Sequence, residues 1–262
     1  MRKMSQERVN EQGQENHGEK EAFYPQTGVA VTCRSFREYE AMFALDGGAP
    51  AAGPTLDVAG GASSFAAELR SRGGRVVSAD PRYAKSAETL YAESLEEIAT
   101  SAAKLERAKD RFDWSYYGSI EAHRANRKRS LERFIADYRA ETGGVSGAYV
   151  AASLPKLPFE DDTFALTLCS HFLFLYEEQF SYEFHRDALK ELYRVTRPGG
   201  EVRAYPLYTL RHERYPGLDD LMRELGDAGA DVRLLPSRLP FISGSTELLA
   251  VSKPARREGR AE

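Results

Sequence analysis

The fold is decided by the stretch Leu-Asp-Val-Ala-Gly-Gly-Ala-Ser-Ser-Phe, residues 56–65. Gly53 and Pro54 end the preceding segment, and Thr55 to Val58 has the apolar character of a short buried strand. Small residues with two glycines follow, and helical spacing of apolar residues begins at Phe65. A strand, a tight turn and a helix present backbone N–H groups to a ligand in many α/β sheets. The same arrangement also serves as a purely structural turn, so other parts of the chain are needed to distinguish the two.

The composition indicates one globular α/β domain. The chain has 262 residues, of which 42% are hydrophobic, enough for a sizeable core. Its formal net charge of -4 argues against a protein that coats nucleic acid, although a local basic patch remains possible. Cys33 and Cys169 are too few for a disulfide scaffold, and no Cys/His spacing suggests a metal site. Because no signal peptide and no apolar run of membrane-spanning length is found, we expect a cytoplasmic protein without membrane contact.

The ends of the chain differ from its middle. Residues 1–22 are polar, with almost no apolar side chains, and residues 255–262 are charged, so both are predicted to be disordered tails. Residues 23–254 form the predicted domain. Phe36, Tyr39 and Phe43 have helical spacing, which predicts an amphipathic helix from Ser35 to Leu45 with Ser35 as its N-cap. This helix either covers a sheet edge or closes over a cofactor, and both roles are compatible with the sequence.

An acid ends the second predicted strand, which begins at Arg75. This residue, Asp80, lies about 20 residues beyond Asp57, the spacing at which a carboxylate on the neighbouring strand accepts hydrogen bonds from a ribose diol. The alternative is that Asp80 caps the turn that follows it. Because the acid occurs together with the glycine turn, the sequence favours binding of a nucleotide-like cofactor.

A long helical insertion is predicted at residues 84–145. Apolar stripes run through Ser86 to Thr142 and are interrupted at residues 114–118. A parallel crossover needs only about a dozen residues, so this segment holds an additional helical subdomain. Because it leaves the sheet directly after the acid, we expect it to form a lid and part of the substrate pocket. The alternative role is dimerisation, and no motif specifies the oligomeric state.

A basic cluster lies within this insertion, from Arg124 to Arg133. Such a run is usually a solvated helix face. The alternative is a docking patch for an anion or phosphate on the substrate side.

The remaining chain predicts alternating strands and helices. The predicted elements are strands at 148–152, 164–169, 201–207, 232–235 and 247–252 and helices at 182–195 and 218–225. The glycines after Arg197 are expected to end the first of these helices with a Schellman-like turn. The last two strands have no helix between them, which predicts an antiparallel hairpin. The sequence therefore predicts a doubly wound, mostly parallel, seven-stranded α/β sheet.

Several segments resemble the class I S-adenosylmethionine-dependent methyltransferases. They are the glycine turn at 56–63, Asp80, the run Leu-Pro-Phe-Glu-Asp-Asp-Thr-Phe at 157–164 and the run Leu-Tyr-Arg-Val-Thr-Arg-Pro-Gly-Gly-Glu-Val at 192–202. Each is weak alone, but in this order they form a strong resemblance over residues 55–80 and 147–207. The resemblance implies a Rossmann-like methyltransferase domain that binds S-adenosyl-L-methionine.

The resemblance also implies a layout for this cofactor. Its methionine end would be lined by the glycine turn, its ribose would be bound by Asp80, and the atoms beneath its sulfonium would face the substrate. The implied cofactor-binding residues are Asp57, Ala59, Gly60, Gly61, Ser63, Asp80, Pro81, Arg82, Ser153, Leu154, Ser170, His171 and Phe172. Ala59 and Ser63 replace glycines that are usual in the family, and Ser63 is expected to cap the following helix instead. Ser153 replaces an acid that commonly contacts the adenine amino group.

Methyl transfer from a sulfonium relies on in-line positioning, because the leaving group is already activated. A base is needed only if the acceptor carries a proton. His171 is the candidate, since it follows the fourth strand at the reaction face and titrates near neutrality. The alternative is that it packs against the cofactor. Tyr176 either orients a substrate or caps the pocket, whereas Tyr116, Tyr117 and His123 are expected to pack within the lid.

These features predict an enzyme that methylates an oxygen or nitrogen atom of a small molecule. Two alternatives remain open. One is a methyltransferase that acts on RNA or protein, for which the basic cluster is the support. The other is a non-catalytic module that keeps the fold and the cofactor site, for which the changes at Ala59 and Ser63 are the support.

Overall fold

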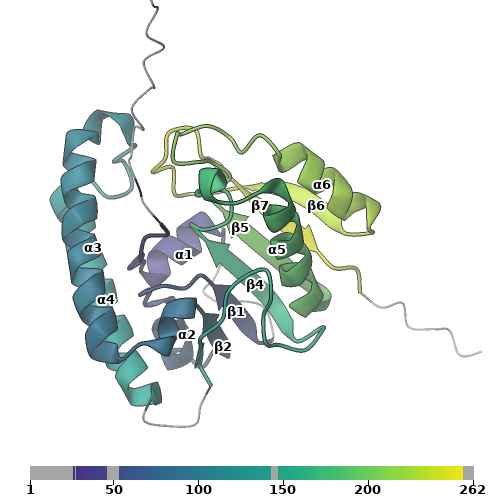
Figure 1. Ribbon diagram of the computed structural model, residues 1–262, viewed down its shortest axis with the longest axis horizontal. Helices are drawn as coiled ribbons and strands as arrows, with labels where there is room; N and C mark the ends of the chain where they lie inside the picture. Colours follow the sequence, from purple (N-terminus) through teal and green to yellow (C-terminus); the bar gives the residue numbers. More distant parts are fainter. Residues whose placement is uncertain (1–25, 27, 46–52, 143–146, 256–262) are drawn as a thin grey trace, which may run out of the picture.

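The computed structural model describes residues 26, 28–45, 53–142 and 147–255 (Figure 1). The predicted tail at 1–22, nearly all of the tail at 255–262 and most of the loop before Gly53 lie outside these residues. The helices are α1 (Phe36–Met42), α2 (Phe65–Ser71), α3 (Ala87–Arg107), α4 (Ile120–Thr142), α5 (Tyr182–Val195) and α6 (Leu218–Asp227). The strands are β1 (Thr55–Val58), β2 (Val76–Ala79), β3 (Tyr149–Val150), β4 (Phe164–Ser170), β5 (Thr196–Tyr205), β6 (Asp231–Pro236) and β7 (Glu247–Ser252).

In the described part of the chain, these strands form one seven-stranded sheet in the order β3-β2-β1-β4-β5-β7-β6. The first five are parallel, and β7 runs antiparallel to both β5 and β6. The parallel strands place their carboxyl ends at one edge of the sheet, where β1, β2 and β4 end next to one another. The structure confirms the predicted fold class, including the closing hairpin.

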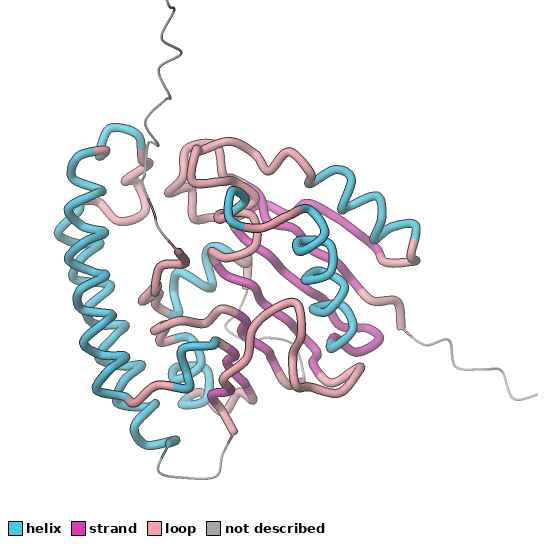
Figure 2. Tube along the Cα trace, in the orientation of Figure 1, coloured by secondary structure: helices cyan, strands magenta, loops and turns pink. Residues whose placement is uncertain are grey.

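Helices cover both faces of the sheet (Figures 1 and 2). Leu56 and Val58 of β1 pack into a core with α5 and α6. Leu166 and Leu168 of β4 pack into a second core with α1 and α2. Residues of neighbouring strands therefore send apolar side chains to both faces, as expected for a buried parallel sheet.

The first helix begins as predicted. Ser35 is the N-cap of α1, and its side chain accepts a hydrogen bond from the backbone N–H of Glu38. The carboxylate of Glu38 accepts one in return from the Ser35 N–H at 2.7 Å, which completes a capping box. The prediction that Ser63 caps α2 is wrong, because the N-cap is Ser64. Ser63 Oγ instead donates to the Arg34 carbonyl and accepts from the Phe65 N–H.

The segment predicted as a helical insertion holds the helices α3 and α4, which lie side by side next to the sheet (Figure 1). Ser86 caps the first turn of α3 by accepting a hydrogen bond from the Thr89 N–H. The pair packs back onto the domain through Phe134 and Tyr138 of α4, whose rings contact Tyr83. The Tyr138 hydroxyl also donates to the Tyr83 carbonyl at 2.9 Å.

The predicted Schellman-like end of α5 is wrong. The helix ends at Val195, and Thr196 is already extended, with φ -85° and ψ 131°. The Thr196 hydroxyl accounts for this end, since it donates to the Leu192 carbonyl at 2.7 Å. The glycines lie inside β5, where a Cβ on Gly200 would stand 2.7 Å from the Ala165 carbonyl oxygen. Gly200 therefore permits a close approach of β4 and β5 at a register shift in the sheet.

No helix in the described ranges is long and apolar enough to cross a membrane.

Candidate cofactor and substrate site

The glycine turn after β1 is packed tightly against β2. Ala59 and Gly61 both have left-handed backbones, with φ 57° and 56°. A Cβ on Gly60 would stand 2.1 Å from the hydroxyl oxygen of Ser78 and 2.8 Å from that of Tyr83. A side chain at position 60 would therefore displace the neighbouring side chains of Ser78 on β2 and Tyr83. The packing alone requires glycine here, apart from any contact with a ligand.

The Asp57 side chain stabilises the turn from inside the protein. Its carboxylate is fully buried and accepts hydrogen bonds from the Tyr39 hydroxyl at 2.9 Å and the Ser78 hydroxyl at 3.0 Å. Burial raises the pKa of Asp57 to about 7, and these two hydrogen bonds oppose the shift. The side chain thus joins α1, β1 and β2 inside the protein.

Asp80 lies beside the turn at the end of β2. One carboxylate oxygen accepts the Gly61 N–H at 3.0 Å, and the other accepts the Arg82 N–H at 2.9 Å. Asp80 also caps the short 3-10 helix Pro81–Ala84, as the alternative interpretation of the sequence suggested. Burial raises the pKa of Asp80, whereas the two N–H donors lower it. Each oxygen has a second lone pair, so both can still accept a hydrogen bond from a ribose hydroxyl.

Residues 28–34 cross over the glycine turn. The Ala62 and Ser64 N–H groups donate to the carbonyls of Thr32 and Arg34, both at 3.0 Å. A Cβ on Gly61 would stand 3.0 Å from the Thr32 carbonyl oxygen. On its other side, the segment is tied to the Tyr176 hydroxyl, which accepts the Ala30 N–H at 3.0 Å. The N-terminal segment is therefore part of this site.

The residues at the sheet edge fit S-adenosylmethionine in their chemistry. A buried carboxylate lies within hydrogen-bonding distance of a glycine turn, which is what a ribose next to an amino-acid moiety requires. Pro81 is exposed beside Asp80, and Arg82 reaches across to Glu93 and to the Val29 carbonyl, both at 3.0 Å. Leu154 lies in the core together with Phe172, while Ser153 is exposed.

A cavity of about 120 Å³ lies above the ends of β4 and β5; we call it the lid cavity. It is lined by Gln26 and residues 30–34, by α3 and α4, and by the loops that follow β4, β5 and β6. Its lining residues are Gln26, Ala30, Val31, Thr32, Cys33, Arg34, Glu97, Ile98, Ser101, Leu105, Phe112, His123, Arg127, His171, Leu175, Tyr176, Leu210, His212, Phe241 and Ile242. His171 and Tyr176 of the predicted site line this cavity, whereas the glycine turn and Asp80 do not.

His171 lies between the sheet edge and the lid cavity. Its backbone has φ 49°, and its N–H donates to the Tyr205 carbonyl at 2.7 Å. Its ring nitrogen Nδ1 lies 3.1 Å from the Ser170 hydroxyl. Burial, followed by the charges of Arg34 and Arg127, holds the pKa of His171 well below its usual range. The imidazole is therefore neutral near pH 7, and the same causes make it a weaker base than a free histidine.

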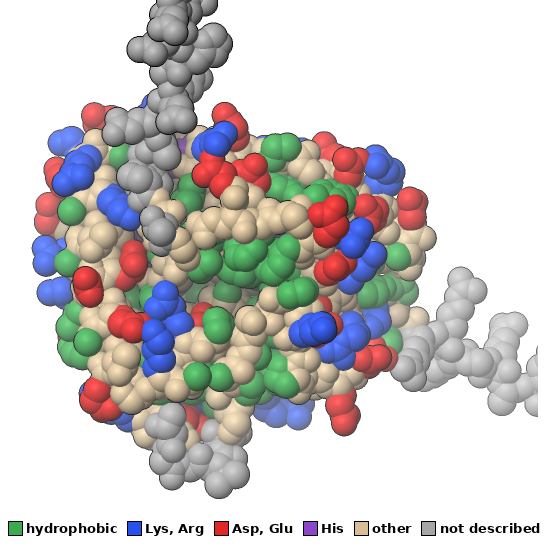
Figure 3. Space-filling view, viewed as in Figure 1, with side chains coloured by type: hydrophobic (Ala, Val, Ile, Leu, Met, Phe, Trp, Pro, Cys, Tyr) green, Lys and Arg blue, Asp and Glu red, His purple; other side chains and the backbone are tan. Residues whose placement is uncertain are grey.

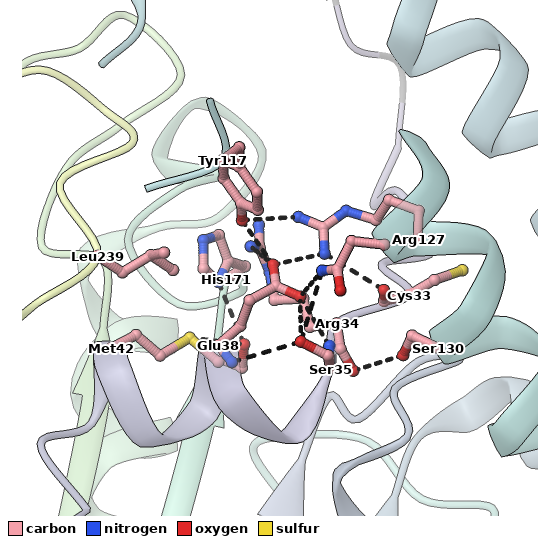
Figure 4. Close-up of polar contacts among 12 residues, drawn as sticks. Cys33, Arg34, Ser35, Glu38, Met42, Tyr117, Arg127, Ser130, His171 and Leu239 are labelled. Carbon is pink, nitrogen blue, oxygen red and sulfur yellow. Dashed lines mark hydrogen bonds and ion pairs between the residues drawn. The ribbon is translucent and has the colours of Figure 1, made fainter. Parts of the chain in front are cut away.

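A buried ionic cluster forms one wall of the lid cavity (Figure 4). Glu38 is fully buried and pairs with Arg127 at 2.6 Å and with Arg34 at 3.3 Å. Its carboxylate also accepts hydrogen bonds from Tyr117 at 2.5 Å and Asn126 at 2.7 Å. Burial would raise the pKa of Glu38, but Arg127 and then Arg34 outweigh it and lower the pKa to about 2. The cluster thus holds two guanidinium groups and one ionised carboxylate.

The side chains of the basic run on α4 differ in their exposure. Arg124, Lys128 and Arg129 are exposed, as in a solvated helix face. Arg127 is buried in the ionic cluster. Figure 3 shows one face of the molecule, on which basic and acidic side chains are interspersed around a hydrophobic centre.

The sequence did not indicate Arg34 and Glu38 as site residues. One local signal was present, since Ser-Phe-Arg-Glu at 35–38 has the spacing of a capping box. The partners Tyr117 and Arg127 come from an insertion far along the chain, and no local pattern places them beside Glu38.

The seven-stranded sheet has the strand order of the class I methyltransferase fold, and a family model matches part of the chain. Residues 129–204 match the family described as "Methyltransferase domain". The uncharacterised protein MJ0045 of Methanocaldococcus jannaschii is 29% identical over 221 residues, which cover 84% of this chain and 94% of that protein.

The solved structures to which the chain is similar are distant in sequence. A TehB-like S-adenosylmethionine-dependent methyltransferase from Corynebacterium glutamicum is 14% identical, covers 80% of this chain and 84% of its own, and has a TM-score of 0.42. An O-methyltransferase family protein from Burkholderia thailandensis is 12% identical, covers 84% of this chain and 57% of its own, and has a TM-score of 0.47. Over residues 129–204 the chain matches a methyltransferase domain, and its seven-stranded sheet has the strand order of the class I, Rossmann-like methyltransferase fold.

Proposed function

We propose that this domain transfers a methyl group from S-adenosylmethionine to an oxygen or nitrogen atom of a small molecule held in the lid cavity. The observation that carries the proposal is the position of this cavity, between His171 at the end of β4 and the helices α3 and α4. Apolar walls with a few polar groups are typical of small-molecule sites. The proposal gives the insertion the role of a lid that closes the acceptor site.

The residues at the sheet edge would hold the cofactor, which supplies an activated methyl group on its sulfonium. In this proposal Asp80 binds the ribose hydroxyls, with Pro81 and Arg82 beside the adenine. Gly60 and Gly61 lie along the methionine end and Asp57 keeps their turn in shape. Ser153 and Leu154 border the adenine edge, and Ser170 and Phe172 lie beneath the sulfonium.

His171 would accept the proton of a hydroxyl or ammonium acceptor. Its neutral imidazole lines the lid cavity and is oriented by Ser170 at 3.1 Å. Tyr176 would act as a positioning residue, because its hydroxyl accepts the Ala30 N–H and thereby fixes the segment that encloses the cavity.

The proposal is tested first by calorimetric titration with S-adenosylhomocysteine. We expect a dissociation constant in the micromolar range and expect Asp80→Ala to weaken binding by more than about tenfold, because it removes charge-assisted hydrogen bonds to the ribose. Asp220→Ala on α6 is the control, since this acid is exposed and far from the turn in sequence. Absence of binding heat together with absence of thermal protection would contradict the proposal.

The competing acceptors are an RNA or a protein that docks on the exposed residues Arg124, Lys128 and Arg129. Acceptor binding would then fall steeply with salt. Cofactor binding without turnover on any acceptor would instead indicate a non-catalytic module.

A further inference from the structure

We infer that the lid cavity selects a methyl acceptor carrying an anionic group, a carboxylate or a phosphate, which Arg34 binds at the wall formed by the ionic cluster. This inference rests on the proposed function, since it names the class of acceptor for the same site. Three features of the cavity support it: the charge of the cluster, the hydrogen bonding of Arg34 and the apolar side chains of the lining.

The cluster has an unbalanced charge. Arg34 and Arg127 each have 8% of the side chain exposed, and the one carboxylate between them belongs to Glu38. Of the other titratable residues that line the cavity, Cys33 and His123 carry no charge, because burial raises the pKa of Cys33 to about 12 and lowers the pKa of His123 to about 2. Glu97 on α3 is a second, half-buried carboxylate of the lining, whose pKa is raised by burial, and it makes no ion pair with Arg34 or Arg127 among the described contacts. A net positive charge in a buried wall is costly unless an anion completes it.

Arg34 has hydrogen-bonding capacity to spare. Its Nη1 donates to Glu38 at 3.3 Å, which is longer than usual for a charged pair. Its Nε is buried and has no hydrogen-bond partner. Arg127, in contrast, donates to Glu38, to the Cys33 carbonyl and to the Tyr117 hydroxyl. The guanidinium of Arg34 is thus the group in this wall that is positioned to accept a further anion.

The arrangement in Figure 4 places this guanidinium next to His171 and Tyr117. The lining of the lid cavity also includes apolar side chains, among them Leu105, Phe112, Leu175 and Phe241, of which Phe241 packs against Tyr117 at 5.1 Å between ring centroids. A ligand that satisfies both the guanidinium and these apolar side chains is a small molecule with an apolar body and one anionic end. The acceptor atom would then lie between that end and His171.

An anion at Arg34 would also act on His171. The charges of Arg34 and Arg127 are two of the three causes that lower the pKa of this histidine. A bound carboxylate or phosphate offsets both charges, so His171 becomes a stronger base when the acceptor is present. Substrate binding and proton acceptance are in this way coupled through Arg34.

The test uses fluorine NMR of the full chain with three probes: 4-fluorobenzoate, 4-fluorophenyl phosphate and 4-fluorobenzamide. The amide has nearly the shape of the benzoate without its charge. We expect at least one anion to bind about tenfold more tightly than the amide, and Arg34→Gln to abolish this preference. Arg124→Gln on the exposed face of α4 is the control for the loss of one positive charge, and it should retain the preference.

Titration of the same proteins with S-adenosylhomocysteine separates the two proposals. If wild type and Arg34→Gln bind the cofactor product equally, Arg34 serves the acceptor, as inferred. If Arg34→Gln loses this binding while the anion probes behave as in wild type, Arg34 holds the cofactor's carboxylate and the inference is overturned. Equal binding of the amide and both anions to wild type also overturns it, even if Arg34→Gln does not fold. Loss of cofactor binding in wild type would contradict the proposed function alone.

Discussion

Ala59 has an unusual backbone for a residue with a side chain. Its φ of 57° lies in the left-handed region, at a position where the methyltransferase family usually has glycine. A Cβ in this conformation approaches the following carbonyl oxygen, at a cost of about 1–2 kcal/mol. Ala59 therefore adopts a backbone conformation that favours glycine, at a cost in stability.

We expect Ala59→Gly to raise the free energy of unfolding by up to about 1 kcal/mol, because relief of the strain exceeds the extra backbone entropy of glycine. Chemical denaturation measures the change. Ala103→Gly at an exposed position of α3 is the matched control, and we expect it to lower stability by about 1 kcal/mol. Destabilisation by both substitutions would show that the turn is not strained.

The positions of Asp57 and Asp80 in the fold were partly predictable from the sequence. The spacing of Asp57 and Asp80 indicated that the two would end neighbouring strands, and the structure places them there. Their hydrogen bonds were not predictable, because the Tyr39 donor to Asp57 comes from a helix whose packing is set by the whole sheet. Whether Asp80 holds a ribose remains a prediction.

At the scale of elements, one buried carboxylate joins the first helix to the insertion. Glu38 caps α1 from within and pairs with Arg127 on α4. The periodicity of residues 36–43 predicted α1, and the stripe through Leu131, Phe134 and Tyr138 predicted α4. Their contact could not be predicted, because ion pairs between distant segments leave no periodic pattern in a single sequence.

We expect Glu38→Gln to destabilise the protein by about 3 kcal/mol or more at pH 7, because it leaves two buried guanidiniums without a counter-charge. The control is Glu40→Gln, at a position two residues after Glu38 on α1. We expect it to change the free energy of unfolding by no more than about 0.5 kcal/mol. Equal effects of the two substitutions in denaturant unfolding would contradict the account of the cluster.

The same carboxylate contributes to acid unfolding. Its pKa falls from 4.5 in the unfolded chain to about 2 in the folded protein. The stability that it supplies is therefore complete above about pH 4.5 and is lost as the pH falls toward 2. The Glu38→Gln variant should lack this part of the decline when unfolding is followed across that range.

At the scale of the whole molecule, the fold could be predicted where it depends on local sequence patterns. The spacing of apolar residues predicted the separate strands and helices, and their order along the chain predicted the closing hairpin and the insertion. The lid cavity was not predictable in detail, because Gln26, residues 30–34, both insertion helices and three loops meet only in the folded protein. Gly200 shows the same limit, since it permits the approach of β4 to β5 and does not end α5.

The central claim is that the cofactor lies at the carboxyl edge of β1, β2 and β4, next to the lid cavity. A crystal structure with S-adenosylhomocysteine bound tests it most directly. We expect the ribose hydroxyls within hydrogen-bonding distance of Asp80, the amino-acid moiety along Gly60 and Gly61, and the sulfur on the side of His171. A ribose bound away from Asp80, or a cofactor that fills the lid cavity, would contradict the claim.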